Sequence, residues 1–88
     1  MSNMKTKFKL IAFDLAKAKT PETPDGLEVV TRKGDVVRII CTNLDSHTPI
    51  VCAYKSSYSE NVTQWYIDGK YYADEDSDMD LFLKQPIK

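Results

Sequence analysis

Apolar and polar residues alternate along most of this chain of 88 residues, and residues that favour turns interrupt the alternation at short intervals. In "TKFKLIAF" the side chains of Lys7 and Lys9 fall on one side of an extended chain, and those of Phe8 and Leu10 fall on the other. A period of two residues is typical of a strand with one buried face. The pattern predicts an all-β fold with at most one short helical turn, at "DLAKAK", capped by Asp14.

Further strands are predicted where β-branched residues cluster between turn signals. Residues 27–31 and 36–42 form a hairpin across "RKGD", where Gly34 supplies the positive φ that the turn requires. Residues 49–54 form another strand, in which Pro49 fits only the first position. The loop "TPETPDG" precedes the hairpin, and "DLFL" forms a last strand that we expect Pro86 to end.

The segment "VTQWYIDGKYYA" carries the clearest local signal in the sequence. Asp68-Gly69 is a preferred dipeptide for a two-residue type I′ turn, and the residues on both sides of it are aromatic or β-branched. The register predicted from this turn pairs Ile67 with Lys70, Tyr66 with Tyr71, and Trp65 with Tyr72. We therefore expect an aromatic hairpin here.

Short strands joined by consecutive hairpins predict a small antiparallel meander curled into a barrel or roll. The length suits one domain, residues 1–88, in which we expect residues 1–6 to be a flexible N-terminus and residues 84–88 a C-terminal tail. The formal net charge is −1, so no overall field draws the chain onto nucleic acid or an anionic membrane. The apolar stretch after the first lysines is too short for a secretion signal or a membrane span, and we expect a cytoplasmic protein.

Chemistry-bearing residues are sparse, and the sequence predicts no enzyme, no catalytic residue and no cofactor. His47 is the single histidine, and the three glycines fall in turns rather than in a phosphate-binding loop. A hairpin centred near Ser46–His47 would place Cys41 and Cys52 opposite each other. Their spacing lacks the Cys-x-x-Cys knuckle of zinc sites, so we expect reduced, shielded thiols in the core and no metal site.

Residues 74–80 carry five acidic side chains and no basic one. Asp74, Asp76 and Asp78 occupy the first three ligand positions of an EF-hand loop, but the glycine at position 6 and the glutamate at position 12 are Met79 and Gln85. The loop is therefore interpreted as a solvated turn that discourages sheet-to-sheet aggregation. A calcium-responsive regulator that uses this loop is kept as an alternative function.

Binding is the function that the composition favours, because tyrosine and tryptophan are enriched in interface cores. We expect a non-catalytic module that contacts a protein partner through an exposed strand edge or through the aromatic hairpin, with Trp65, Tyr66, Tyr71 and Tyr72 as the partner-binding residues. Binding of single-stranded nucleic acid is the first alternative, with aromatic stacking beside basic side chains. These basic residues would be Lys5, Lys7, Lys9 and Arg38. The adjacent acidic loop would repel the phosphates of a nucleic acid. The sequence does not predict the oligomeric state.

The segments "VVTRKGDVVRIICTNL", "TPIVCAY" and "DGKYYADEDSDMDLFL" resemble a recurrent class of small β-rich proteins from gut Bacteroidetes, their phages and mobile elements. The resemblance covers about residues 13–83, and the shared motifs are structural ones. "TPETPDG" and "SSYSEN" depart from that pattern. The resemblance implies an accessory protein of phage or mobile DNA, and it carries no site residues over to this chain.

Overall fold

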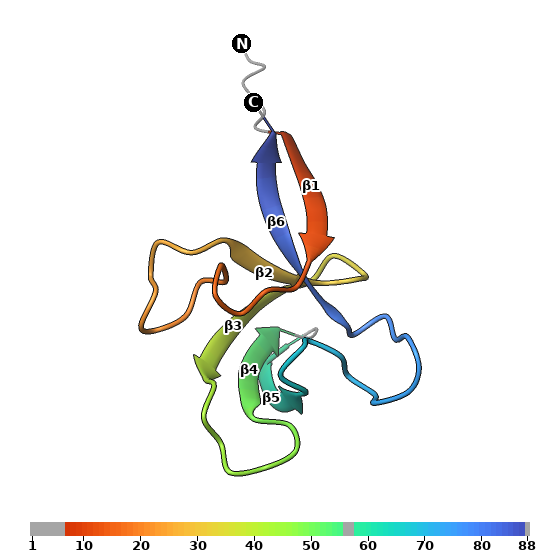
Figure 1. The fold of residues 1–88 in the computed structure, drawn as a ribbon. Coiled ribbons are helices and arrows are strands. Elements are labelled where there is room, and N and C mark those ends of the chain that lie inside the picture. The colour runs from red at the N-terminus through yellow and green to blue at the C-terminus, as the bar shows by residue number, and fades with distance from the viewer. Residues whose placement is uncertain (1–6, 56–57, 88) are drawn as a thin grey trace.

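The computed structural model describes residues 7–55 and 58–87, which form one six-stranded sheet (Figure 1). Its strands are β1 (Lys7–Ala12), β2 (Glu28–Thr31), β3 (Val36–Cys41), β4 (Ile50–Lys55), β5 (Glu60–Trp65) and β6 (Leu81–Ile87). The all-β class predicted from the sequence is confirmed. The predicted flexible N-terminus, residues 1–6, lies outside the described residues.

The segment "DLAKAK" forms a turn rather than a regular helix. The backbone N–H of Lys17 donates to the carbonyl oxygen of Asp14 at 2.9 Å, and the Asp14 carboxylate accepts from the N–H of Ala16 at 3.0 Å. Asp14 therefore caps the turn as expected. Within residues 7–55 and 58–87 there is no helix of the length and hydropathy that a membrane crossing requires.

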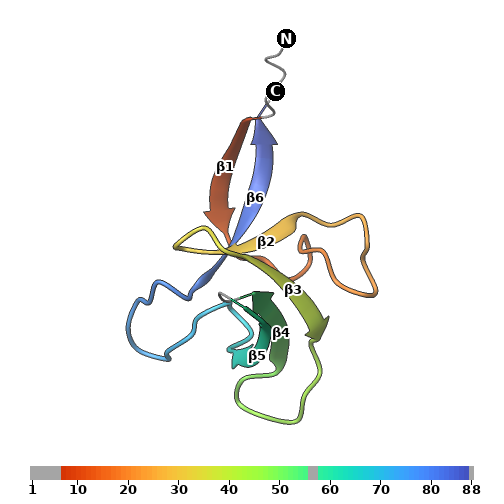
Figure 2. The same cartoon turned by 180° about the vertical axis from the view of Figure 1, so that it is seen from behind.

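The sheet has the strand order β1-β6-β2-β3-β4-β5, and every pair of neighbours is antiparallel. Strands β2 to β5 form the predicted meander, but β6 inserts between β1 and β2. Of the expected barrel or roll, the barrel is wrong, because closure requires the two edge strands to pair. Among the described residues β1 pairs only with β6 and β5 only with β4, so both edges stay open (Figures 1 and 2).

The hydrophobic core lies on one face of the sheet. Strand β3 alternates clearly, with Val37 and Ile39 buried while Val36, Arg38 and Ile40 are exposed. The buried residues of the core cluster are Ala18, Val29, Val37, Ile39, Ile50, Cys52, Trp65, Leu81 and Leu83, and Val30 and Ala53 are also buried but lie outside it. Residues of the segment between β1 and β2 pack against this face and close the core from the other side; they are Phe13, Leu15, Ala18 and Leu27.

Strands β1 and β6 form an arm that projects from the rest of the sheet (Figures 1 and 2). The strand predicted around Phe8 and Leu10 exists, but the prediction that it is half-buried is wrong. Phe8 is 43% exposed and Leu10 is 48% exposed. The physical reason is that Phe8 and Leu10 lie beyond the core cluster, which only Ile11 of β1 reaches.

Strand β6 continues through Pro86 to Ile87, so the prediction that Pro86 ends it is wrong. The peptide groups of an antiparallel strand point alternately to its two neighbours. The N–H of Thr31 donates to Asp35 on the β3 side at 2.8 Å. The preceding residue, Val30, therefore turns its peptide groups toward β6, where it lies opposite Phe82. Phe82 and every second residue after it, Lys84 and Pro86, turn theirs toward β2. Strand β2 has already ended opposite Lys84, so no strand lies beside Pro86 on that side. The missing N–H of Pro86 therefore costs no ladder hydrogen bond.

The turn at Asp68-Gly69 differs from the predicted type I′ turn. A type I′ turn needs positive φ at both central residues, yet only Gly69, with φ 88°, has it, and no described residue other than glycine does. The N–H of Gly69 donates to Tyr66, and the N–H of Tyr66 donates to Lys70 at 2.9 Å. These bonds describe a three-residue loop ending in a left-handed glycine. Tyr66 faces Lys70 instead of Tyr71, and residues 70–73 form no strand, so the prediction of an aromatic hairpin with two strands is wrong.

Candidate functional site

Trp65, expected on a partner-binding surface, is fully buried in the core. Its indole Nε1 donates a hydrogen bond to the carbonyl oxygen of Met79 at 2.7 Å. The rings of Tyr54 and Tyr71 pack edge-on against it, with centroids at 6.4 and 5.7 Å. Trp65 therefore stabilises the fold and offers no surface to a partner.

The three tyrosines of the predicted binding set lie at different depths. Tyr66 and Tyr71 are half-buried, whereas Tyr72 is 51% exposed. Tyr71 packs between Trp65 and Tyr72, and its ring centroid is 5.0 Å from that of Tyr72. The structure thus joins Trp65, Tyr71 and Tyr72 in one stack that runs from the core to the surface, rather than in an exposed platform, and Tyr66 is not part of this stack.

The acidic loop is anchored by Asp80, whose side chain is buried. Its Oδ1 accepts from the N–H of Tyr71 at 2.9 Å, and its Oδ2 accepts from the N–H of Ser77 at 3.1 Å. Arg32 and Lys70 lie 3.1 and 3.4 Å from the same Oδ2. Burial alone would raise the pKa of Asp80, but these donors and cations outweigh it and hold that pKa below 3.8.

A second carboxylate of the loop is also neutralised by bases from elsewhere in the chain. Asp76 lies 2.6 Å from the Nζ of Lys70 and 3.8 Å from Arg32. The hydrogen bond from Lys70 lowers the pKa of Asp76, and the same bond raises the pKa of Lys70. Asp74, Glu75 and Asp78 stay exposed. The loop is therefore tied to the body at two carboxylates and solvated at the other three.

Metal ligands do not converge in residues 7–55 and 58–87: no group of three His, Cys, Asp or Glu side chains could hold an ion. The Asp76 carboxylate is occupied by Lys70, and calcium would have to displace that ammonium group. The calcium alternative therefore gains no support from this geometry.

The two cysteines lie on neighbouring strands, β3 and β4, and both are free. A register shift between Ile39 and Cys41 sets Cys41 opposite Val51 and Cys52 opposite Ile39, so the prediction that the cysteines face each other is wrong. Cys52 is fully buried and Cys41 is half-buried. The pKa of the Cys52 thiol is raised to about 12, mainly by burial and to a smaller extent by the charge of the nearby Cys41.

The basic and aromatic residues of the nucleic-acid alternative are not brought into one groove. Lys7 and Lys9 lie on the arm, and Lys5 lies outside the described residues. Arg38 lies on β3, where its Nη2 contacts both carboxylate oxygens of Glu60 at 3.0 and 3.1 Å. The aromatic stack lies beside the acidic loop instead. His47 is exposed in the loop between β3 and β4.

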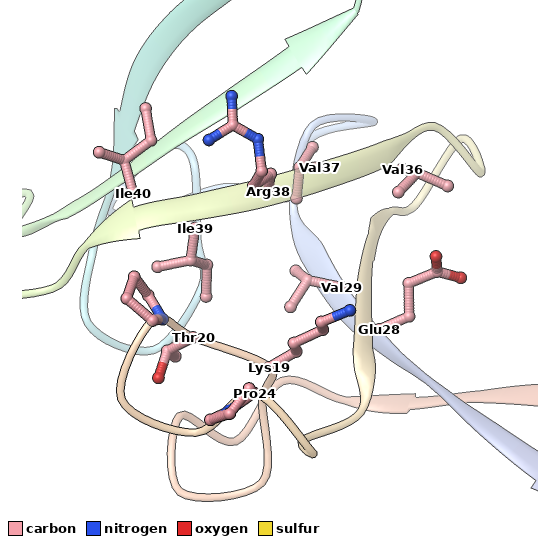
Figure 3. Close-up of a pocket in the computed structure, with 11 residues that line it drawn as sticks. Lys19, Thr20, Pro24, Glu28, Val29, Val36, Val37, Arg38, Ile39 and Ile40 are labelled. Atoms are coloured by element: carbon pink, nitrogen blue, oxygen red, sulfur yellow. The ribbon is translucent and has the colours of Figure 1, made fainter.

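A groove of about 460 Å³ lies between β3 and the loop that precedes β2 (Figure 3). Most of its lining is apolar. The lining residues are Lys19, Thr20, Pro21, Pro24, Glu28, Val29, Val36, Val37, Arg38, Ile39 and Ile40. In Figure 3 the side chain of Ile39 points from β3 toward the loop that carries Thr20, while Arg38 points to the opposite side. We call this site the β3 groove.

The β3 groove exists because β2 and β3 separate early. They pair only at Val29 with Val37 and at Val30 with Val36. The next residue of β2 in this ladder would be Leu27, but its N–H donates to Lys17 and its carbonyl accepts from Lys19, both at 2.8 Å. Alternation turns the N–H and C=O of Ile39 to the β2 side. Ile39 therefore presents an unpaired ladder position to the β3 groove.

The outer wall of the β3 groove is held by its own hydrogen bonds. Thr20 and Thr23 exchange backbone hydrogen bonds at 3.0 and 3.1 Å, and their hydroxyl groups lie 2.9 Å apart. Thr23 also accepts from the N–H of Gly26 at 3.0 Å. Pro21 and Pro24 restrict the backbone further. The wall is therefore formed before any ligand arrives.

Sequence reasoning missed the β3 groove, since its two sides come from segments that are about twenty residues apart. The one available signal was the Pro-rich loop "TPETPDG", which interrupts the alternation directly before the predicted hairpin. No protein-family model, curated protein or solved structure shows significant similarity to this chain. The resemblance to proteins of Bacteroidetes and their mobile elements stays a prediction.

Proposed function

We propose that the protein is a non-catalytic binding module that takes an extended segment of a partner protein into the β3 groove. The observation that carries this proposal is the unpaired ladder position at Ile39 beside a preformed apolar wall. An extended peptide can add to an open sheet edge through backbone hydrogen bonds, while pockets for its side chains supply specificity. Of the two binding modes expected from the sequence, the strand edge is favoured, because Trp65 lies in the core.

The geometry limits the kind of segment that fits. A strand added beside Ile39 contacts Val37 and Ile39 on the core face and Ile40 on the outer face. Proline cannot donate to the ladder, so the segment carries none at the position opposite Ile39. Its side chains toward the loop wall are apolar and of moderate size. An accessory role in phage or mobile DNA, implied by the resemblance, is part of this proposal and names no partner.

The test is a screen of randomised linear peptides, followed by titration of a selected peptide against two variants. Ile40→Lys places a charge beside the β3 groove, and Val62→Lys places the same charge on β5, outside it. We expect Ile40→Lys to weaken binding about tenfold, which is ~1.4 kcal/mol, and Val62→Lys to leave it unchanged. Amide exchange at Ile39 should slow in the complex. Equal loss in both variants, or unchanged exchange at Ile39, would refute the proposal.

A further inference from the structure

The open edge of β1 lies on the arm, and strands β6 and β2 separate it from β3 (Figures 1 and 2). Strand β2 pairs with β6 only as far as Lys84, which lies opposite Glu28. Beyond it, residues 85–87 of β6 pair with β1 alone. A two-stranded ribbon without a covering layer is marginally stable in water. The distal arm therefore has the most to gain from a third strand.

The backbone of β1 offers regular hydrogen-bonding positions at this edge. Since Pro86 and Lys84 turn their peptide groups toward the β2 side, Ile87 and Gln85 turn theirs toward β1. Their partners Lys7 and Lys9 are thereby bonded to β6. The N–H and C=O groups of Phe8 and Leu10 then point outward, where no described strand lies. A partner strand would complete the ladder at these two residues.

The side chains of β1 alternate between two chemistries. Phe8 and Leu10 share one face, and Lys84 lies over the Phe8 ring at 4.4 Å from its centroid. Lys7 and Lys9 are exposed on the other face and form no ion pair with any described residue. An added strand would thus meet the apolar side chains of Phe8 and Leu10, with Lys84 beside them, on one face and the two unpaired lysines on the other.

Basic and acidic residues are unevenly distributed along the sequence. Residues 1–13 and 81–88 contain five of the 12 basic residues and none of the 13 acidic ones. The other seven basic residues and all acidic residues lie in residues 14–80. Within the described part of the arm, Lys84 lies 3.5 Å from Glu28, whereas Lys7 and Lys9 form no ion pair, so the β1 edge keeps a local positive charge that attracts an anionic partner.

We infer that the free edge of β1 binds a segment of a partner protein in which acidic and apolar residues alternate. The acidic side chains face Lys7 and Lys9, the apolar ones face Phe8 and Leu10, and the segment joins the sheet beside β1. A second copy of β1 is a poor occupant, because its own lysines would lie opposite Lys7 and Lys9. Nucleic acid is also disfavoured, since the lysines and Phe8 lie on opposite faces and one strand cannot contact both.

The inference is tested by measuring the binding of three labelled peptides to the protein by fluorescence anisotropy. One alternates glutamate and isoleucine, the second has the same composition in two blocks, and the third alternates lysine and isoleucine. We expect the alternating acidic peptide to bind and the other two to bind at least about tenfold more weakly. A labelled oligothymidylate serves as the nucleic-acid probe and is expected not to bind.

Protein variants then locate the site. Lys7→Glu with Lys9→Glu should abolish binding of the acidic peptide and allow binding of the lysine peptide. Lys33→Glu with Lys55→Glu makes the same change in net charge on the body and should leave binding unchanged. Leu10→Pro removes an outward N–H without removing a bond to β6, so it should weaken binding while the arm persists. Fluorescence of the buried Trp65 reports that the body of each variant is folded.

Amide exchange separates this inference from the β3 groove. Binding of the acidic peptide should slow exchange at Phe8 and Leu10 and leave Ile39 unchanged, so each proposal can fail while the other stands. The inference is overturned if the peptide with its residues in two blocks binds as well as the alternating one, or if the Lys7→Glu, Lys9→Glu variant binds the acidic peptide fully. It is also overturned if the peptide protects Ile39 instead, or if oligothymidylate binds and the peptide does not.

Discussion

The indole N–H of Trp65 donates to the carbonyl oxygen of Met79 at 2.7 Å and thereby links the end of β5 to the end of the acidic loop. Trp65 is fully buried and Met79 is half-buried, so removing the indole takes away the partner that this carbonyl has inside the protein. One hydrogen bond therefore joins the hydrophobic core to the most charged segment of the chain.

Trp65→Phe should destabilise the protein through this carbonyl. Leaving a buried acceptor unsatisfied costs about 1–3 kcal/mol, and the smaller ring adds a cavity to that loss. The measurement is the free energy of unfolding in urea, monitored by circular dichroism because the tryptophan is absent. Tyr72→Phe, at an exposed ring, should change it by less than ~0.5 kcal/mol. Similar values for the two variants would contradict the buried role of Trp65.

Asp80→Asn should destabilise the protein at neutral pH by about 1–3 kcal/mol, since the buried carboxylate binds two backbone N–H groups and two cations. Asp74→Asn, at an exposed position, serves as the control and should be nearly neutral. Urea titrations of both variants and the parent at pH 7 give the comparison.

The effect of Asp80→Asn should depend on pH in a defined direction. The pKa of Asp80 in the folded state lies below 3.8, its usual value in the unfolded chain. The carboxylate therefore contributes its full stability above that usual value, and the contribution is lost as the pH falls through the lower folded pKa. The difference between the parent and Asp80→Asn should shrink in acid. A difference that grows below pH 4 would refute the assignment.

Calcium at millimolar concentration should leave the melting temperature unchanged. Asp76 already pairs with Lys70, and Asp74 and Asp78 find no third ligand among the described residues. A real site with calcium at 100 times its dissociation constant would stabilise the folded state by about 2.7 kcal/mol. Thermal scans with calcium and with a chelator decide between the two, and a rise that Asp74→Asn with Asp78→Asn removes would establish a calcium site.

The two thiols should react at clearly different rates. Burial raises the pKa of Cys52 to about 12, so its reactive thiolate is scarce at neutral pH. Cys41 is half-buried and more accessible. A bulky thiol reagent followed by mass spectrometry should modify Cys41 first and Cys52 only on unfolding. Cys41→Ser, in which modification should be slow, is the control, and rapid labelling of that variant would show that Cys52 is accessible.

Gly26→Ala should destabilise the protein more than Gly34→Ala. A Cβ at Gly26 would lie 2.4 Å from the backbone carbon and oxygen of Ala18, so the backbone itself must move. Gly34 has φ 105° but open space around it, and its cost is the left-handed conformation alone, roughly 1–2 kcal/mol. Chemical denaturation gives the free energy of unfolding of both variants. A smaller loss in Gly26→Ala than in Gly34→Ala would show that the backbone beside the β3 groove shifts at little cost.

The sequence by itself determined the features that depend on neighbouring residues. The alternation in "VVRII" set which side chains of β3 enter the core, because a strand turns successive residues to opposite faces. "RKGD" determined the hairpin between β2 and β3, because Gly34 could adopt the positive φ that the turn requires. Asp14 capped its turn for an equally local reason.

Only the tertiary structure decided which segments from distant parts of the chain meet. Strand β6 lies between β1 and β2, so the sheet is not a closed barrel and Phe8 is exposed on the edge strand. Pro86 lies where β6 has no neighbour on the β2 side, so it costs no hydrogen bond. Trp65 is buried in contact with the segment that follows its turn, in which the carbonyl of Met79 accepts the indole N–H. Leu27 bonded to residues 17–19 instead of β3, and this choice left Ile39 open and created the β3 groove. Each outcome is a competition between partners far apart in sequence, which local periodicity does not record.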